Sequence, residues 1–417
     1  MLSTLKNAFK VPELRGKLLF TAVMFLIFRL GCHIPAPGIN PAMLDQLFTQ
    51  NIFGFIDIIS GGAFMNISLF AMGIMPYINA SIIMNLLTMI IPYFENLSKQ
   101  GPEGRKKMAQ ITRYGCAILG FVQALAMSFY LKSAMYDFNF FTVMVLTISL
   151  TAGTVMLMWM GEMITEKGIG NGISLIIFAG IVSRIPDGIV YLFQSLRSGE
   201  INFFEVLLFL VIAFVIVVGI IYIQEGQRRI PVQYAKRVVG RKMYGGQSTF
   251  IPMKVNQAGV IPIIFAMSLL MLPTMICGFF PDNAVCAAIT RWFSATHPVY
   301  NILNVALIIF FTYFYTAVTF SPVDVADNLK KNGGFIPGLR PGRPTAEYID
   351  RILTRLCLAG AVFLAFIALL PNLMSIVTGI DLGFGGTSLL IAVGVALDTM
   401  KQLESQVLMR SYQGFMK

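Results

Sequence analysis

Ten runs of mostly apolar residues, each close to 20 residues long, constrain the fold of this chain more than any other feature. A helix of about 20 apolar residues is long enough to cross the hydrocarbon core of a bilayer. Charged residues make up only 12% of the 417 residues, against about a quarter in a soluble domain. The sequence therefore predicts an all-α integral membrane protein with ten transmembrane helices and excludes a disordered chain. The runs lie at approximately 18–33, 67–91, 112–131, 141–161, 172–193, 203–223, 257–279, 301–320, 351–370 and 384–403.

Two of these runs need comment. The first follows a basic start and ends in the turn at 34–38, where no small-residue cleavage site stands, so it is expected to be a retained span. Arg184 and Asp187 interrupt the fifth run. Its span is expected to end near Val182, with an interfacial helix after it.

The orientation follows from the distribution of basic residues. Ten spans put both termini on one side, and that side carries 26 of the 31 Lys and Arg residues, whereas the opposite side carries four. Both termini are therefore expected in the cytoplasm.

Residues 52–66 are too short and too glycine-broken to cross the membrane. They contain Gly61 and Gly62, in a stretch without Lys or Arg from Arg29 to Lys99. Irregular backbone at membrane depth is tolerated where it is buried in protein or lines a water-filled cavity. We expect a short re-entrant or external segment and, with it, an outward-facing cavity.

Two loops, at about 224–256 and 321–350, are longer and more basic than a connection requires. The first alternates like a β-hairpin with Gly245-Gly246 at its tip. Attraction to anionic lipid explains the charge, and so does docking of an acidic or RNA-bearing partner. The Pro-Gly rigidity around Arg340 favours docking, since lipid attraction needs no fixed shape. No specific nucleic-acid sequence is implied.

Catalytic and cofactor motifs are missing from the sequence. There is no Walker A pattern and no nucleophile or zinc-protease motif, which predicts that the chain is not an enzyme and holds no metal or cofactor. The glycines at 168–172 resemble a phosphate loop only loosely, and a helix entrance capped by Asn171 or Ser174 is favoured. The five cysteines are expected to be buried free thiols, with pairing of Cys277 and Cys286 as the alternative.

Few ionisable residues lie within the spans. Arg29, Glu162 and Glu205 are near predicted span ends and are expected to snorkel. This disfavours an ion-coupled transporter, although unwound backbone carbonyls remain an alternative cation site. An intramembrane enzyme or insertase would need a hydrophilic groove or a nucleophile and base, and neither is found.

Isoleucine accompanies glycine and proline in several spans. Ile74 and Ile78 are four residues apart, as are Ile173 and Ile177, so each pair shares a helix face. Ordinary lipid or helix packing explains such spacing equally well.

At these motifs the chain resembles the SecY family of bacterial protein-translocation channels over essentially its whole length. The order and spacing of the motifs make coincidence very unlikely. They lie at 73–78, 101–106, 168–174, 227–229, 234–237, 254–262, 326–331, 337–342 and 384–390.

The resemblance implies two pseudo-symmetric halves around an hourglass pore, at 18–194 and 195–404, flanked by cytoplasmic tails at 1–17 and 405–417. It implies an apolar ring at the waist of this pore, which is hard to wet and resists ions. By motif position the ring residues are Ile74, Ile78, Ile173, Ile177, Ile264 and Ile391.

The family also has a plug and a lateral gate. The plug corresponds to about 52–66 and includes Phe55, Ile56, Ile58, Ile59, Gly61 and Gly62. The polar cluster of the gate corresponds to Asn79, Gln123 and Asn256, although Asn79 differs from the small hydroxyl residue common there. Secreted chains with signal sequences would pass through the pore, and hydrophobic helices would leave through the gate.

The resemblance finally implies a multi-pass protein of the bacterial cytoplasmic membrane with SecE and SecG as partner subunits. The SecA motor ATPase or the ribosome would dock on the basic loops and drive transport. The docking residues would be Arg228, Arg229, Lys236, Arg237, Arg241, Lys242 and Arg340.

Overall fold

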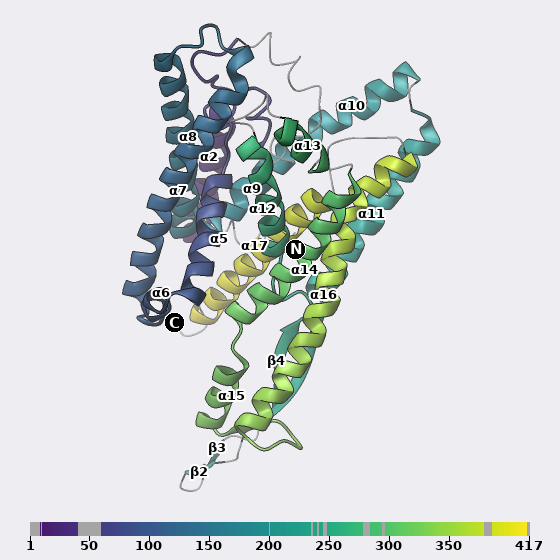
Figure 1. Ribbon diagram of the computed structural model, residues 1–417. Helices are drawn as coiled ribbons and strands as arrows, with labels where there is room; N and C mark the ends of the chain where they lie inside the picture. Colours follow the sequence, from purple (N-terminus) through teal and green to yellow (C-terminus); the bar gives the residue numbers. More distant parts are fainter. Residues whose placement is uncertain are drawn as a thin grey trace.

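A computed structural model describes residues 9, 11–40, 60–199, 201–234, 237–239, 242–244, 248–277, 284–293, 297–378 and 386–414. Every predicted apolar run contains a helix, and these helices form the body seen in Figure 1. They are α2 (Pro12–Gly31), α5 (Met75–Ile90), α7 (Pro102–Tyr130), α8 (Phe140–Lys167), α9 (Gly172–Ser183), α11 (Phe203–Glu225), α12 (Ile261–Cys277), α14 (Pro298–Thr319), α16 (Arg343–Thr378) and α17 (Gly386–Gly414).

Shorter elements join them. These are α6 (Pro92–Lys99), η3 (Leu131–Ala134), α10 (Ile185–Ser198), α13 (Ala284–Trp292) and α15 (Pro322–Lys331). By length and composition alone, six helices in the described residues can cross a membrane, or seven if the bent pair α5 and α6 is one span. α2 and α17 carry charges among their apolar residues, and α12 is short, which explains why this criterion leaves them out.

The second run was predicted to be helical from residue 67, and this is wrong for residues 67–74. The helix α5 begins only at Met75. Ile67 has φ +37° and Gly73 has φ +56°, values that a right-handed helix cannot contain. Proline follows at the second position of α5, where its missing N–H costs nothing. At its other end α5 turns by 100° into α6 through the extended residue Ile91, since Pro92 disfavours helical backbone before it.

The fifth run breaks where the sequence indicated. The helix α9 ends at Ser183, and α10 starts at Ile185 with Pro186 in its first turn. Arg184 lies between the two helices. The expected end near Val182 is therefore confirmed to within one residue.

A single large apolar cluster fills the middle of the helical body and includes buried residues of α2, α5, α8, α9, α11, α12, α14, α16 and α17. Close helix approaches permit this packing. A Cβ atom at Gly172 would collide with the carbonyl oxygen of Gly161, so α8 and α9 touch through their backbones. Small residues at such crossings let helices pack by van der Waals contact within a membrane.

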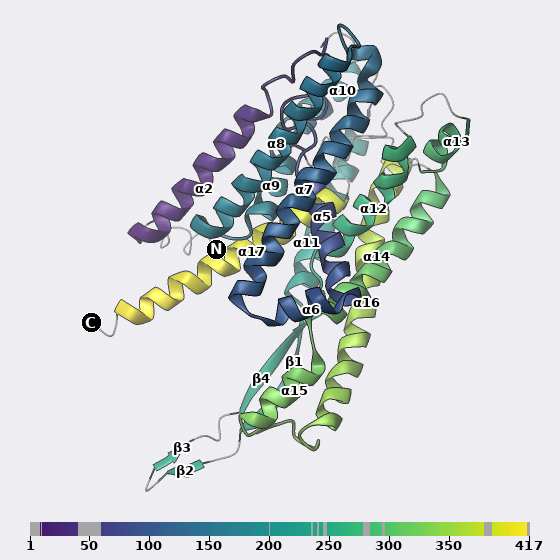
Figure 2. The same ribbon diagram turned by 60° about the vertical axis from the view of Figure 1, so that its left-hand side comes forward.

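The two basic loops form one folded projection below the helical body (Figure 2), which we call the basic module. It consists of a sheet of β4 (Ser248–Lys254), β1 (Gln227–Tyr234) and β5 (Gly334–Phe335), in that order, packed against α15 and the first turns of α16. Ile230, Val232, Met253 and Ile349 are among the buried residues of its own small apolar core. The module therefore has a fixed shape, which a purely electrostatic lipid anchor does not require.

The predicted hairpin in the first basic loop exists, but its tip is not at Gly245-Gly246. Strands β1 and β4 pair from Gln227↔Lys254 to Gln233↔Ser248. A second small hairpin, of β2 (Arg237–Val239) and β3 (Lys242–Tyr244), extends beyond them. Val239 pairs with Lys242, so the chain reverses between these two residues, and the two glycines lie between β3 and β4.

The helix α17 runs obliquely across the base of the body (Figures 1 and 2). It continues without interruption to Gly414, past the predicted tail boundary at residue 404. The start of α2, the residue Ile169 and the distal part of α17 share a small apolar cluster that includes Leu14 and Leu403. Apolar contacts thus hold the distal part of α17 against the start of α2.

Candidate functional site

The six isoleucines singled out in the sequence meet in the central apolar cluster, although four different stretches of chain supply them. Ile74, Ile78, Ile177 and Ile391 are each at most 6% exposed. Ile173 and Ile264 are partly buried and pack against the same cluster. The starts of α5, α9, α12 and α17 thereby bring the six side chains into one apolar region of the cluster, which we call the constriction.

Local signals in the sequence position the isoleucines of α9. The Asn171 side chain accepts hydrogen bonds from the backbone N–H groups of Ile173 (3.1 Å) and Ser174 (3.4 Å), which starts the helix. The expected cap at Asn171 is confirmed. Because the helix starts here, Ile173 and Ile177 lie one turn apart on its first two turns.

A turn before α12 positions Ile264 in the same way. The Asn256 side chain donates a hydrogen bond from Nδ2 to the carbonyl oxygen of Gly259, 3.1 Å away. Gly259 has φ +64°, a backbone conformation that glycine adopts at little cost. The turn feeds directly into α12.

A cavity of about 530 Å³ opens beside the constriction. Ile177, Ile264 and Ile391 are among its apolar lining residues. Lys254, the last residue of β4, also lines it, so the cavity lies on the side of the body that carries the basic module. Its polar lining comprises Asn171, Ser174, Gln224, Lys254, Asn256, Gln257, Tyr315, Asp398, Thr399, Lys401, Gln402 and Ser405.

Three amide side chains in this lining have buried atoms without a hydrogen-bond partner in the described part of the chain. They are Nε2 of Gln224, Oδ1 of Asn256 and Oε1 of Gln257. A buried amide without a partner is costly, which indicates that water or a passing polar group satisfies these atoms. Sequence reasoning missed Gln224 and Gln257; their positions at the facing ends of the sixth and seventh runs were the available signal.

On the far side of the constriction, an irregular buried segment at residues 60–74 packs against α2 and α9. The backbone N–H of Ala36 donates to the carbonyl oxygen of Ile67, and that of Leu69 donates to the carbonyl oxygen of Ile34, each at 2.9 Å. Gly61 has φ +68° and Gly62 has φ +86°. The other predicted plug residues, Phe55, Ile56, Ile58 and Ile59, lie outside the described residues.

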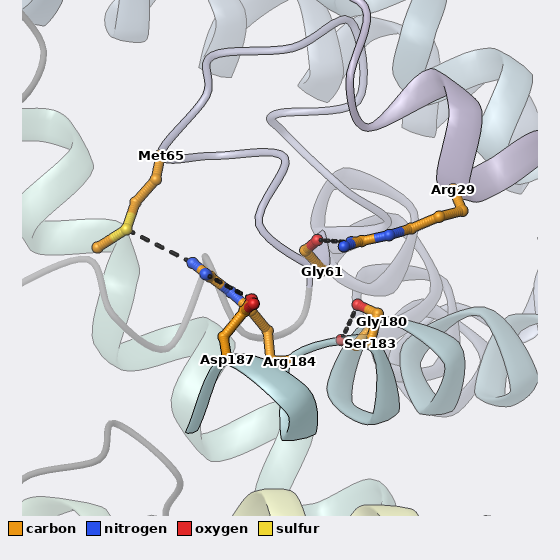
Figure 3. A network of polar contacts seen from close by, with 7 residues as sticks. All are labelled: Arg29, Gly61, Met65, Gly180, Ser183, Arg184 and Asp187. Carbon is orange, nitrogen blue, oxygen red and sulfur yellow. Dashed lines mark hydrogen bonds and ion pairs between the residues drawn. The ribbon is translucent and has the colours of Figure 1, made fainter. Parts of the chain in front are cut away.

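The three charged residues near predicted span ends have protein partners. Arg29 donates a hydrogen bond from Nη1 to the carbonyl oxygen of Gly61, 2.8 Å away (Figure 3). Glu162 pairs with Arg113 across α8 and α7 at 2.8 Å. Glu205 accepts from the backbone N–H of Asn202 and completes a capping box at the start of α11. The charged ends of all three side chains are thus hydrogen-bonded or ion-paired with neighbouring protein groups.

The three predicted gate residues are all buried, on α5, α7 and the turn before α12. Asn79 is 9%, Gln123 6% and Asn256 6% exposed. In the described residues no hydrogen bond joins any two of them. Their common role stays a prediction.

Three of the predicted docking residues, Arg228, Arg229 and Arg340, lie in the basic module. Arg228 and Arg229 are exposed on β1, and the Arg229 guanidinium lies 4.8 Å from the centre of the Phe250 ring. The side chain of Arg340 is exposed, while its backbone carbonyl accepts a 2.8 Å hydrogen bond from Thr345. Arg237 and Lys242 lie on β2 and β3, and Lys236 and Arg241 lie outside the described residues. Docking by these residues remains untested.

The five cysteines, all in described positions, are free thiols. Cys32, Cys116, Cys277 and Cys357 are buried, and Cys286 is partly buried. The alternative of a bond between Cys277 and Cys286 is not realised here.

The SecY family model matches residues 68–400. Curated relatives named protein translocase subunit SecY align over whole chains. The relative from Halalkalibacterium halodurans is 49% identical over 100% of both chains. The relative from Aquifex aeolicus is 45% identical over 99% of both.

Solved structures share the fold. A structure described as a protein conducting channel matches with a TM-score of 0.72 at 22% identity, covering 93% of this chain and 91% of the other. The channel of a canine ribosome-channel complex from the endoplasmic reticulum matches with a TM-score of 0.67 at 20% identity, covering the same shares. The predicted all-α membrane fold is confirmed.

Proposed function

The chain belongs to the SecY family, and from this we propose that it is the channel subunit through which unfolded secretory polypeptides cross the bacterial membrane. The observation that carries the proposal is the constriction itself. Six isoleucines from separate stretches of chain converge beside a polar cavity. An apolar waist resists ions, and branched side chains close softly around a moving chain of any sequence.

We propose that Ile74, Ile78, Ile173, Ile177, Ile264 and Ile391 form the pore ring and that the polar cavity is the cytoplasmic vestibule. The unpartnered amides of Gln224, Asn256 and Gln257 support this, because an amide both donates and accepts hydrogen bonds. Such groups can exchange water for the backbone of an extended chain without selecting its side chains.

The segment at 52–66 is proposed to be the plug that closes the outer side at rest. One of the similar structures bears a description in which the plug domain of SecY stabilises the closed state and maintains a membrane seal. In the present chain, the described part of this segment is residues 60–66. It lies against the constriction through Ala63, which is buried in the same cluster as Ile74. Asn79, Gln123 and Asn256 would form the seam of the lateral gate.

We propose that the protein acts without catalysis of its own and that partners supply the energy. The fixed shape of the basic module suits docking of the SecA motor or the ribosome through Arg228, Arg229, Lys236, Arg237, Arg241, Lys242 and Arg340. SecE and SecG would complete the complex. Two halves, at 18–194 and 195–404, would part around the pore, with both termini in the cytoplasm and anionic lipid around the basic faces.

Site-specific photo-crosslinking tests the pore. A photoreactive residue is placed at Ile78 or Ile264, and at Leu210, which is 54% exposed on α11, as the control. A secretory protein is then stalled midway in membranes that contain the motor. Crosslinks at both ring positions and none at Leu210 are expected. Translocation without a crosslink at either ring position would show that these isoleucines only pack the core.

A further inference from the structure

Two arginines from distant parts of the chain hold the same short segment, residues 60–65 (Figure 3). Arg29, near the end of α2, donates to the carbonyl oxygen of Gly61 at 2.8 Å. Arg184, at the break between α9 and α10, points from the opposite side, with Nη2 3.4 Å from the sulfur of Met65 and Nη1 3.4 Å from Asp187. The segment is therefore held from both sides.

The backbone of this segment lies very close to its neighbours at two glycines. A Cβ atom at Gly61 would lie 3.0 Å from the Cα of Gly180 and 3.0 Å from the hydroxyl of Ser183. A Cβ atom at Gly62 would lie 3.4 Å from the Arg184 guanidinium. Two consecutive left-handed glycines thus bring the backbone directly against α9 and Arg184.

The hydrogen bond from Arg29 to Gly61 stabilises a charge that lies within a predicted span. A charged side chain within a predicted span is costly unless it is paired or hydrogen-bonded. In the described residues no carboxylate pairs with Arg29, and its side chain donates to the Gly61 carbonyl. A charge-assisted hydrogen bond is shorter and stronger than a neutral one. Residue 61 therefore contributes to the stabilisation of this charge.

The held segment is also continuous with the constriction. Ala63 is fully buried in the same cluster as Ile74 and Ile78. Ser60 lies against Gly73, the residue before Ile74, where an added Cβ would lie 3.6 Å from the Ser60 Cβ. Displacement of residues 60–65 would therefore disturb the backbone that carries the first two isoleucines.

We propose that Arg29 and Arg184 form a clamp that holds residues 60–65 in the resting position and that must release when the passage opens. This rests on the proposed function of the chain as a channel. Arg29 binds a backbone carbonyl, so its contact does not depend on the side chains of the segment. Arg184 contacts the other end of the segment at Met65. Release of either arm weakens the outer seal.

The first test measures resting ion flux through the full chain, with its copurifying subunits, in liposomes without substrate. Arg29→Gln and Arg184→Gln are each expected to raise the flux about tenfold, since loss of a hydrogen bond from a charged group shifts an equilibrium by about that factor. Arg197→Gln is the matched control, because Arg197 is an exposed arginine in the last turn of α10. Equal flux in the wild type and both clamp variants would overturn the clamp.

A covalent lock tests release independently of any loss of folding. Cysteines at Gly61 and Ser183 are close enough for a disulfide, which copper–phenanthroline forms and dithiothreitol reduces. Oxidation of Gly61→Cys/Ser183→Cys is expected to stop translocation, and reduction to restore it. The two single variants are the controls and should translocate equally with and without oxidant, while mass analysis of Gly61→Cys alone checks that no bond to the native Cys32 forms.

Translocation at the wild-type rate by the oxidised pair, with the disulfide verified by mass, would contradict release. Failure of the wild type to translocate any secretory protein would instead contradict the proposed function. The ion-flux assay needs no substrate, so it tests the clamp whether or not the chain translocates secretory proteins.

Discussion

Lys401 of α17 forms an ion pair with Glu225 at the C-terminal end of α11, with Nζ 2.8 Å from Oε1. Lys401 also lines the polar cavity. Both side chains are nearly half exposed, at 44% and 49%. The pair therefore links two helices beside the polar cavity, where solvent strongly screens the two charges.

Breaking this pair should cost little stability. A double-mutant cycle of Lys401→Ala and Glu225→Ala is expected to give a coupling energy of about 0.2–1 kcal/mol, the usual range for exposed pairs. Thermal unfolding of the purified chain at low and high salt measures it, and salt should reduce it. A coupling energy of several kcal/mol, insensitive to salt, would contradict this assignment.

The contact of α8 with α9 should be intolerant of a single methyl group. Gly172→Ala would press a Cβ against the Gly161 carbonyl and should lower stability by about 1–3 kcal/mol. Gly219→Ala on α11 meets nothing within 4 Å and serves as the control. Helix propensity predicts that the control gains up to about 1 kcal/mol. Thermal midpoints in detergent compare the two, and equal midpoints would refute the close crossing.

Polarity at the ring should determine the ion seal. Ile391→Asn is expected to raise resting ion flux severalfold, because an amide allows water into an apolar constriction. Ile391→Val keeps the ring apolar and should leave the seal intact, at a packing cost of about 1 kcal/mol. Flux through liposomes distinguishes them. An unchanged seal in Ile391→Asn would remove Ile391 from the ring.

The exposed side chain of Arg340 should matter for docking and not for folding. Arg340→Ala is expected to weaken motor binding by about tenfold, as truncation of an interface hot spot does. The thermal midpoint should stay unchanged, since Thr345 holds the Arg340 backbone. Arg343→Ala is the control, because Arg343 is 91% exposed and pairs with Glu347. Equal binding by both variants would contradict a specific contact at Arg340.

The orientation of the chain can be read by labelling. A cysteine at Asn332, exposed in the basic module, should react with a membrane-impermeant maleimide only after the membrane is permeabilised. A cysteine at Tyr136, which is 67% exposed between α7 and α8, should react in intact spheroplasts. The reverse pattern would place the basic module outside the cell.

Hydropathy predicted the helices well because each span must satisfy its own backbone hydrogen bonds within the membrane. It failed at residues 67–74, which are apolar yet not helical. There the backbone is buried in protein and finds partners such as the Ile34 carbonyl, so hydropathy cannot distinguish it from a helix. The same limit applies to Arg29: the sequence shows a charge in a span, and only the fold shows that its partner is a carbonyl 32 residues away.

By itself, the sequence determined the apolar segments, the clustering of the basic residues in certain loops, the break at Arg184 and a helix start at 171–174. These depend on local composition and on hydrogen bonds between near neighbours, which a linear pattern records. The tertiary structure alone decided that six isoleucines meet beside a cavity lined by Gln224 and Gln257, and that two arginines hold residues 60–65. These relationships join stretches far apart in the chain, and their geometry arises only when the helices pack.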